Sequence, residues 1–452
     1  MSVLARLLTP ADFGYIAMAT VVTELAALFG GFGFTNVLIQ RRVINRLQLD
    51  TVFWAALSVG SLLALAVFSL SFVAAWFYKD PLTGELLRVL CISFLLNSVT
   101  NVHEAIVARL MRFKIEFFIQ ISSIAIRGLA AIGFAYYGFG VWSLVAGALT
   151  GSAVSLFCYL LAVPFRPRFR FHAAYLVSNW KTSGSYFSSG FLYYINTNLD
   201  LILIGRFLGA SALGYYQNAR SLTDEIRARI AMPLQRVLFP AFSAIQADRE
   251  RLQQTVLRSA RLLAAIIIPV GLGLSAVSEE LVPVLYGDQW LAMIPVLSLF
   301  GVSAAIRGAT AISSPLFNSQ NQVGLALKYN CVGTALMVMG ILIGIPHGVV
   351  GVSIAVACSS LYSLVTFRVG LSLIGLSLRH VIQVLGFPAL AATVMWLSIA
   401  ALRPISTEWT KGHANLLFVH VFVGALVYSS TLHLFSRQYF RDFLDLGKKL
   451  RS

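Results

Sequence analysis

Long apolar segments follow one another along almost the whole sequence and constrain its fold more than any other feature. A bilayer core about 30 Å thick is crossed by a helix of about 20 mainly apolar residues. Runs of that length, bounded by charged or turn-forming residues, cover residues 11–39, 51–78, 86–108, 117–137, 141–163, 180–204, 212–242, 256–282, 290–317, 329–345, 349–370, 381–402 and 416–435. The pattern predicts an all-α polytopic membrane protein with thirteen spanning helices in this sequence.

The composition agrees with a membrane fold. Charged residues make up 12% of the chain and apolar residues 58%, whereas soluble domains have about 25% charged residues. The four cysteines stand singly within apolar runs and have no paired spacing, which excludes a disulfide scaffold and a thiolate metal site; they are Cys91, Cys158, Cys331 and Cys358. We therefore expect no metal and no cofactor.

Basic residues outnumber acidic ones by 34 to 18, a formal net charge of +16. In a soluble protein this charge would suggest nucleic acid. Here the basic residues lie in short clusters between apolar runs, so we expect no nucleic-acid partner. Of the 34, 22 fall on one side of the predicted membrane and six on the other. Because cytoplasmic loops hold the excess of Lys and Arg, the C-terminus is predicted to be cytoplasmic.

The first eight residues are too short to span a membrane. With thirteen spans and a cytoplasmic C-terminus, they fall on the outer side, and their sequence MSVLARLL resembles the last two turns of an earlier helix. They lack the regions and cleavage site of a signal peptide. We therefore expect the first helix of the fold to be largely missing, through a late start codon or a truncated gene model.

A repeat relates two parts of the sequence. Residues 5–24 align without gaps with residues 205–224, with six identities that include Gly14 with Gly214, and Glu24 aligns with Asp224. Both copies begin on the outer side, so the halves are predicted to be parallel repeats. A central cavity between two such bundles is expected.

The repeat defines the predicted domains. An N-terminal lobe, residues 1–165, holds the truncated helix 1 and helices 2–6, and a cytoplasmic linker follows at 166–178. A C-terminal lobe, 179–371, holds helices 7–12, and residues 372–452 form helices 13 and 14 and a basic cytoplasmic tail. The predicted architecture is two six-helix bundles with two additional C-terminal helices.

Arginines inside the predicted spans are the first candidate binding residues. A charge at the bilayer centre is costly and usually faces protein or a water-filled cavity, and a guanidinium suits phosphate oxygens. The candidates for binding a diphosphate are Arg127, Arg307, Arg220 and Arg227. For Arg127, snorkelling of the side chain to an interface is the alternative. Glu225, Arg229 and Arg236 are equally well explained by charge neutralisation on a protruding helix.

Uncharged polar residues form stripes at helical spacing on two other spans. Hydroxyl and amide groups in such stripes suit sugar hydroxyls, and the candidates are Tyr186, Tyr193, Asn196, Asn97 and Asn101. Hydrogen bonds between helices explain these stripes equally well.

Four acidic residues in the spans are candidates for ion coupling: Glu24, Asp224, Glu104 and Asp200. Glu24 and Asp224 are the matched acids of the repeat. Asp200 could instead be exposed near the outer interface. His103 is better explained as a packed polar residue than as a proton relay.

Enzyme signatures are missing from the sequence. It contains no Gly-x-Ser-x-Gly elbow, Walker loop, His-Glu-x-x-His motif or dinucleotide fingerprint. The longest predicted outer loop, residues 403–415, offers only Glu408 and His413 as an acid or base. We therefore expect a protein that is not an enzyme.

Several motifs together resemble one known family. They are 5-ARLLTPADFG-14, 38-LIQRR-42, 140-GVW-142, 198-NLDLILIGRFLG-209, 213-LGYY-216, 239-FP-240 and 285-LYGDQW-290. Taken together, they are similar to Wzx-type polysaccharide exporters, in the branch of colanic acid exporters and O-antigen flippases. This branch belongs to the multidrug/oligosaccharidyl-lipid/polysaccharide exporter superfamily.

The resemblance implies a fourteen-helix transporter in the bacterial inner membrane. It would move undecaprenyl-diphosphate-linked oligosaccharide repeat units from the cytoplasmic to the periplasmic leaflet by alternating access, and ion antiport is one way to drive it. Its partners would be the lipid-linked oligosaccharide, the bilayer, a polysaccharide polymerase and glycosyltransferases. The alternatives are a multidrug or metabolite antiporter of the same superfamily, a membrane polysaccharide polymerase or ligase, and a purely structural membrane protein.

Overall fold

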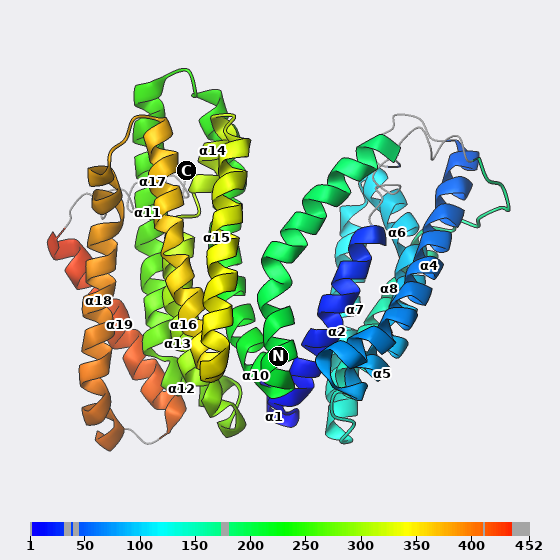
Figure 1. Cartoon of the computed structure of the whole chain (residues 1–452), viewed down its shortest axis with the longest axis horizontal. Helices are drawn as coiled ribbons and strands as arrows, with labels where there is room; N and C mark the ends of the chain where they lie inside the picture. The colour runs from blue at the N-terminus through cyan, green and yellow to red at the C-terminus, as the bar shows by residue number, and fades with distance from the viewer. Residues whose placement is uncertain (1, 31–37, 39–44, 173–179, 410–411, 436–452) are drawn as a thin grey trace. The chain divides into compact units, whose positions relative to one another are not determined.

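The computed structural model describes residues 2–30, 38, 45–172, 180–409 and 412–435 of the 452-residue chain (Figure 1). In this part of the chain the regular elements are helices, and no strand occurs. Most are α-helices: α1 (Ser2–Leu7), α2 (Pro10–Gly30), α4 (Arg46–Tyr78), α5 (Pro81–Leu90), α6 (Ile92–Arg109), α7 (Phe113–Tyr136), α8 (Trp142–Ala162), α10 (Trp180–Ala244), α11 (Arg249–Ala276), α12 (Ser278–Leu285), α13 (Ile294–Ala309), α14 (Ser313–Ser319), α15 (Val323–Gly344), α16 (Gly348–Ser360), α17 (Tyr362–Leu373), α18 (Leu378–Trp409) and α19 (His413–Phe435). Two short 3₁₀ segments are η1 (Asp288–Met293) and η2 (Ile345–His347).

Eleven helical stretches of the described residues are long and apolar enough to cross a membrane. The predicted all-α polytopic membrane fold is therefore confirmed. Val323–Leu373 includes two of the thirteen predicted spans, and Tyr194–Ala244 includes one span, 212–242, and the last part of the span 180–204. Gly209 breaks the helical path of α10 with φ 83° and ψ −177°. Gly348, with φ 71°, follows η2 in the second stretch. Both backbone conformations favour glycine.

Local sequence signals set several helix ends. At the start of α4, Asn45 and Gln48 form a capping box. At the start of α5, the Asp80 carboxylate accepts a hydrogen bond from Leu82 N, and Pro81 occupies the first turn. At the start of α11, the Asp248 carboxylate accepts a hydrogen bond from Arg251 N. These caps satisfy backbone donors that the helices leave free.

The chain divides into two compact units, Met1–Gly214 and Tyr215–Ser452. The division falls after Gly214, whereas the sequence places the linker between lobes at 166–178. The reason is that the first part of α10 contacts α2. The Tyr194 hydroxyl donates to the carbonyl of Val21 at 2.7 Å, and the Asn198 amide donates to the Glu24 carboxylate at 3.2 Å.

The first unit contains a close crossing of α2 and α10. A Cβ added at Gly14 would collide with the carbonyl of Ala210, and one added at Gly214 would collide with the carbonyl of Pro10. The two contacts are equivalent under the sequence repeat, because at the offset of 200 residues Gly14 aligns with Gly214 and Pro10 aligns with Ala210. A reciprocal contact of this kind is expected where two copies of one motif meet about a two-fold axis. The parallel-repeat arrangement of two full bundles remains a prediction.

Residues of the predicted linker lie on the first turns of α4. Arg168 N donates to the Asp50 carboxylate at 3.1 Å, and Trp54 Nε1 donates to the Arg168 carbonyl at 2.8 Å. The ring of Trp54 stacks on Phe169 with centroids 4.4 Å apart. Side-chain contacts therefore fasten the start of the linker to α4 within the first unit.

The last two helices are part of the second unit. Helix α18 packs against α11 and α19, and the Tyr428 hydroxyl on α19 donates to the carbonyl of Ala265 on α11 at 2.8 Å. Buried apolar residues of α10, α11, α13, α17 and α18 form one continuous core. This unit carries most of the groups described next.

Candidate functional site

Two arginines enclose an aspartate on the second part of α10. Arg227 Nη2 donates to Asp224 Oδ1 at 3.0 Å, and Arg220 Nε donates to Asp224 Oδ2 at 3.4 Å. The side chains of Arg220, Asp224 and Arg227 are 16%, 38% and 31% exposed. The i, i+4 and i+7 spacing places all three on one stripe of the helix, as predicted.

Arg307 of α13 also interacts electrostatically with Asp224, as Arg220 and Arg227 do, and Arg220 and Arg227 form ion pairs with it. Three guanidinium groups that interact with one carboxylate leave a formal excess of two positive charges. We call Arg220, Asp224, Arg227 and Arg307 the arginine cluster. The structure thus brings together three of the four predicted diphosphate-binding residues.

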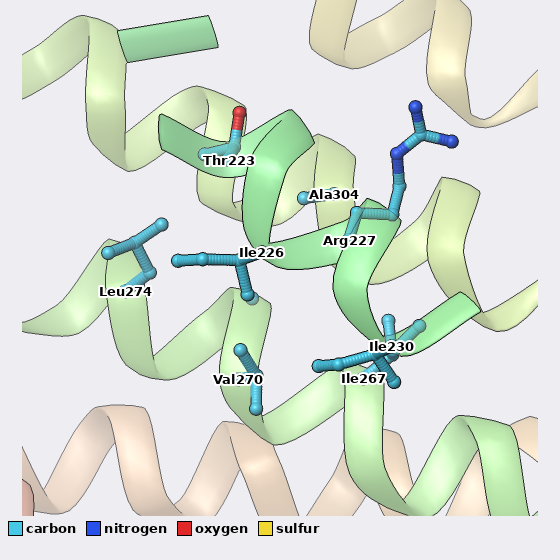
Figure 2. Close-up of a pocket in the computed structure, with 9 residues that line it drawn as sticks. Thr223, Ile226, Arg227, Ile230, Ile267, Val270, Leu274 and Ala304 are labelled. Atoms are coloured by element: carbon cyan, nitrogen blue, oxygen red, sulfur yellow. The ribbon is translucent and has the colours of Figure 1, made fainter. Parts of the chain in front are cut away.

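An apolar cleft lies directly beside the cluster (Figure 2). Its lining includes Ile226 and Ile230 of α10, Ile267 and Val270 of α11, and Ala304 of α13. Figure 2 shows the guanidinium of Arg227 pointing away from these apolar side chains. The open volume is only about 10 Å³, roughly the space of one water molecule. The cleft therefore supports the base of Arg227 and has no room for a ligand.

A much larger groove of about 640 Å³ lies elsewhere in the second unit. Apolar residues of α11, α13, α17 and α18 line it, among them Leu272, Ile306, Leu364 and Leu385, together with Arg368. Sequence reasoning missed this groove, because it is built by two helix pairs, α11 with α13 and α17 with α18, that are distant from each other in the sequence. An apolar groove of this size suits a hydrocarbon chain.

Arg127, the fourth predicted diphosphate-binding residue, lies in the first unit on α7. It is exposed, and the stem of its side chain packs against Gly151 of α8. A glycine at this position lets the two helices and the arginine stem approach closely. The joint action of Arg127 with Arg307 on one diphosphate remains a prediction.

The predicted ion-coupling acids have different surroundings. Glu24 is exposed and accepts a hydrogen bond from Asn198, whereas Asp224 forms two ion pairs in the arginine cluster. Asp200 is buried, and its carboxylate accepts a hydrogen bond from Leu201 N at 2.9 Å. Glu104 on α6 is partly buried. The matched acids of the repeat therefore have different bonding partners.

The predicted sugar-lining residues are only partly described. Asn97 and Asn101 are exposed on α6, one helical turn apart, and Asn196 is exposed on α10. The side chains of Tyr186 and Tyr193 lie outside the described residues.

His103 is fully buried, and its Nδ1 lies 2.9 Å from the Val99 carbonyl. That environment agrees with the packed role expected for His103.

Sequence reasoning missed one charged group entirely. Arg403 of α18 pairs with Glu279 and Glu280 of α12, and His420 of α19 lies beside Glu280. The sequence shows a histidine inside an apolar run and a pair of adjacent acids. Since the two acids are more than 100 positions from Arg403 and from His420, helical spacing could not connect them.

In the described part of the chain, no three His, Cys, Asp or Glu side chains gather as a metal site would require.

Comparisons with known proteins define the family. Residues 3–295 match the family model described as "Polysaccharide biosynthesis protein". The lipopolysaccharide biosynthesis protein WzxC of Escherichia coli (strain K12) is 29% identical over 346 residues, which are 76% of this chain and 70% of WzxC.

Two further proteins are similar over nearly the whole chain. The succinoglycan biosynthesis transport protein ExoT of Rhizobium meliloti (strain 1021) is 26% identical over 99% of this chain and 91% of ExoT. The solved structure of the lipid II flippase MurJ, in an inward closed conformation, superimposes with a TM-score of 0.75 at 16% identity. That superposition covers 98% of this chain and 96% of MurJ, and it shows the shared fold. Because the family model covers well over half of the sequence, the chain belongs to the polysaccharide biosynthesis protein family.

Proposed function

We propose that this protein is a flippase that moves a diphosphate-linked lipid oligosaccharide across the membrane by alternating access. The arginine cluster is the observation that carries the proposal. Its excess of positive charge on a membrane-spanning helix suits a ligand with several anionic oxygens. The name of MurJ is that of a lipid flippase, and the name of ExoT is that of a polysaccharide biosynthesis transport protein.

The mechanism assigns separate roles to the parts of the substrate. The diphosphate pairs with Arg307, Arg227 and Arg220, and Arg127 of the first unit contributes in one of the conformations. The sugars contact the polar residues Tyr186, Tyr193, Asn196, Asn97 and Asn101. The polyprenyl tail stays in hydrocarbon surroundings, for which the 640 Å³ groove offers one apolar path. Rocking of two helical bundles then changes the side to which the diphosphate is open.

Release of the diphosphate requires a competing interaction. Asp224 already occupies two of the arginines, so it competes with the ligand for the same donors. Ion binding at Glu24, Asp224, Glu104 or Asp200 would bias this competition.

The proposed location is the bacterial inner membrane, with a cytoplasmic C-terminus. Glycosyltransferases that make the substrate and a polymerase that uses it are the proposed functional partners.

Polymer export in cells tests the role of the cluster. The double variant R227A/R307A is expressed in a strain that lacks its own exporter and makes the matching lipid-linked sugar. We expect it to reduce surface polymer about tenfold or more, because each substitution removes a charge-assisted contact with the diphosphate. R229A is the matched control, since Arg229 is exposed on the same helix and pairs with Glu225. Full export by the double variant, at equal protein level, would contradict the assignment.

The accumulated intermediate distinguishes the proposed flippase from a polymerase. Loss of a flippase leaves lipid-linked units facing the cytoplasm, whereas loss of a polymerase leaves single units at the surface. A drug antiporter for cations would need acidic cavity residues, and the positive charge of the arginine cluster argues against that alternative.

A further inference from the structure

A non-helical segment of the first unit, residues 165–172, follows α8 and lies on the first turns of α4. Its sequence, FRPRFRFH, alternates basic and aromatic residues. We call it the basic–aromatic segment. None of the steps proposed for transport uses these residues.

Helix α4 holds the segment through its backbone. Hydrogen bonds join backbone atoms of the segment to side chains of α4: Arg168 N donates to Asp50 Oδ1 at 3.1 Å, His172 N to Thr51 Oγ1 at 3.1 Å, Arg46 Nη2 to the Arg166 carbonyl at 3.0 Å, and Trp54 Nε1 to the Arg168 carbonyl at 2.8 Å. The ring of Phe165 packs edge-on against Phe53, with centroids 6.1 Å apart. Because these hydrogen bonds use backbone atoms of the segment, they do not require its arginine side chains.

The exposed side chains of the segment combine positive charge with apolar surface. Arg166, Arg168 and Arg170 are exposed, and Phe169 and Phe171 are 90% and 58% exposed. Apolar rings in water are unfavourable, and neighbouring guanidinium groups repel one another. A partner that relieves both must offer anionic groups beside an apolar region.

The position of the segment in the fold places it at the surface of the bilayer. Helix α8 has 21 residues and a length of about 31 Å, about the thickness of the hydrocarbon core. The segment starts just after its last residue, Ala162. Helix α4 has 33 residues, about 50 Å, so its ends extend into the headgroup region. The distribution of basic residues predicts that this end is cytoplasmic, and the cytoplasmic leaflet carries anionic lipids.

We propose that the basic–aromatic segment binds anionic phospholipids of the cytoplasmic leaflet. Arg166, Arg168 and Arg170 pair with the phosphate groups, and Phe169 and Phe171 lie at the boundary between headgroups and acyl chains. The attachment to α4 orders the segment before it meets the lipid, which lowers the entropic cost of binding. The inference does not depend on the identity of the transported lipid.

Photocrosslinking at position 169 tests the proposal. The whole chain, with p-benzoylphenylalanine in place of Phe169, is reconstituted in nanodiscs with equal parts of phosphatidylglycerol and phosphatidylcholine. After irradiation, mass spectrometry identifies the attached molecule. We expect phosphatidylglycerol to be attached about tenfold more often than phosphatidylcholine, because each arginine near an anionic surface strengthens binding by about fivefold. Equal attachment of the two lipids, or a crosslink to protein with no attached lipid, would overturn the proposal.

Charge variants of the segment, made in the same crosslinking protein, identify the cause of the preference. In R166Q/R168Q/R170Q we expect the preference for phosphatidylglycerol to fall to about twofold or less. In R166K/R168K/R170K it should remain, since lysine keeps the positive charge and the bonds to α4 use the backbone. A full preference in the glutamine variant, or its loss in the lysine variant, would exclude the proposed binding by the arginine charges.

A matched variant of the second unit separates the segment from the charge of the whole protein. R251Q/K328Q/R379Q removes three positive charges from exposed side chains on α11, α15 and α18. Because these residues lie outside the segment, crosslinking at position 169 should keep the preference for phosphatidylglycerol. A loss as large as that in R166Q/R168Q/R170Q would show that net charge, and not the basic–aromatic segment, selects the lipid.

Discussion

Asp224 is the residue at which binding and release of an anion would be balanced. It holds Arg220 and Arg227 in ion pairs and interacts with Arg307, while its side chain stays 38% exposed. Sequence spacing predicted the stripe of α10 that includes Asp224. It could not predict that Arg307 interacts with Asp224, because that interaction depends on the tertiary position of α13.

Replacing Asp224 by Asn should favour anions. The substitution removes the competing carboxylate and keeps a similar volume, so we expect inorganic pyrophosphate to bind about tenfold more tightly to D224N than to the wild type. Isothermal titration of the purified protein in detergent measures this affinity. E225Q is the control, because Glu225 pairs with Arg229 outside the cluster and its loss should leave the affinity unchanged. Weaker binding by D224N would show that Asp224 does not compete with the ligand.

At the scale of helices, hydropathy predicted the spans well but could not predict their partners. Two apolar runs predicted the two halves of α10 as separate spans, and Gly209 marks the break between them. The repeat at an offset of 200 residues identified Gly14 and Gly214 as equivalent. The reason for glycine at both positions became visible only in the structure, where each opposes a backbone carbonyl. Such close approach of helices in a membrane requires residues without a side chain.

The crossing of α2 and α10 should tolerate no methyl group. G214A is expected to destabilise the protein by about 1–3 kcal/mol, because the new Cβ would collide with the Pro10 carbonyl. Thermal unfolding in detergent measures the loss. G128A is the matched control, since a Cβ at Gly128 in α7 meets no atom within 4 Å and alanine favours a helix. A melting temperature of G214A as high as that of G128A would argue against the close crossing.

For the whole molecule, the sequence predicted the fold class and the family, because both depend on local patterns repeated along the chain. The division after Gly214 was not predicted, since it depends on side-chain contacts of Tyr194 and Asn198 with α2. The ion pairs of Arg403 with Glu279 and Glu280, and the 640 Å³ groove, were missed for the same physical reason. Each joins parts of the chain that are distant in sequence, and hydropathy carries no information about such neighbours.

Lipid flipping by the purified protein tests the central claim most directly. The whole chain is reconstituted in vesicles that contain a fluorescent polyprenyl-diphosphate oligosaccharide, and a membrane-impermeant glycosidase reports how much of it reaches the outer leaflet. The account predicts that wild-type protein makes nearly all of the labelled lipid accessible, and that R227A/R307A slows this about tenfold or more. If the wild type leaves half of the lipid protected, as in vesicles without protein, the proposed function is contradicted.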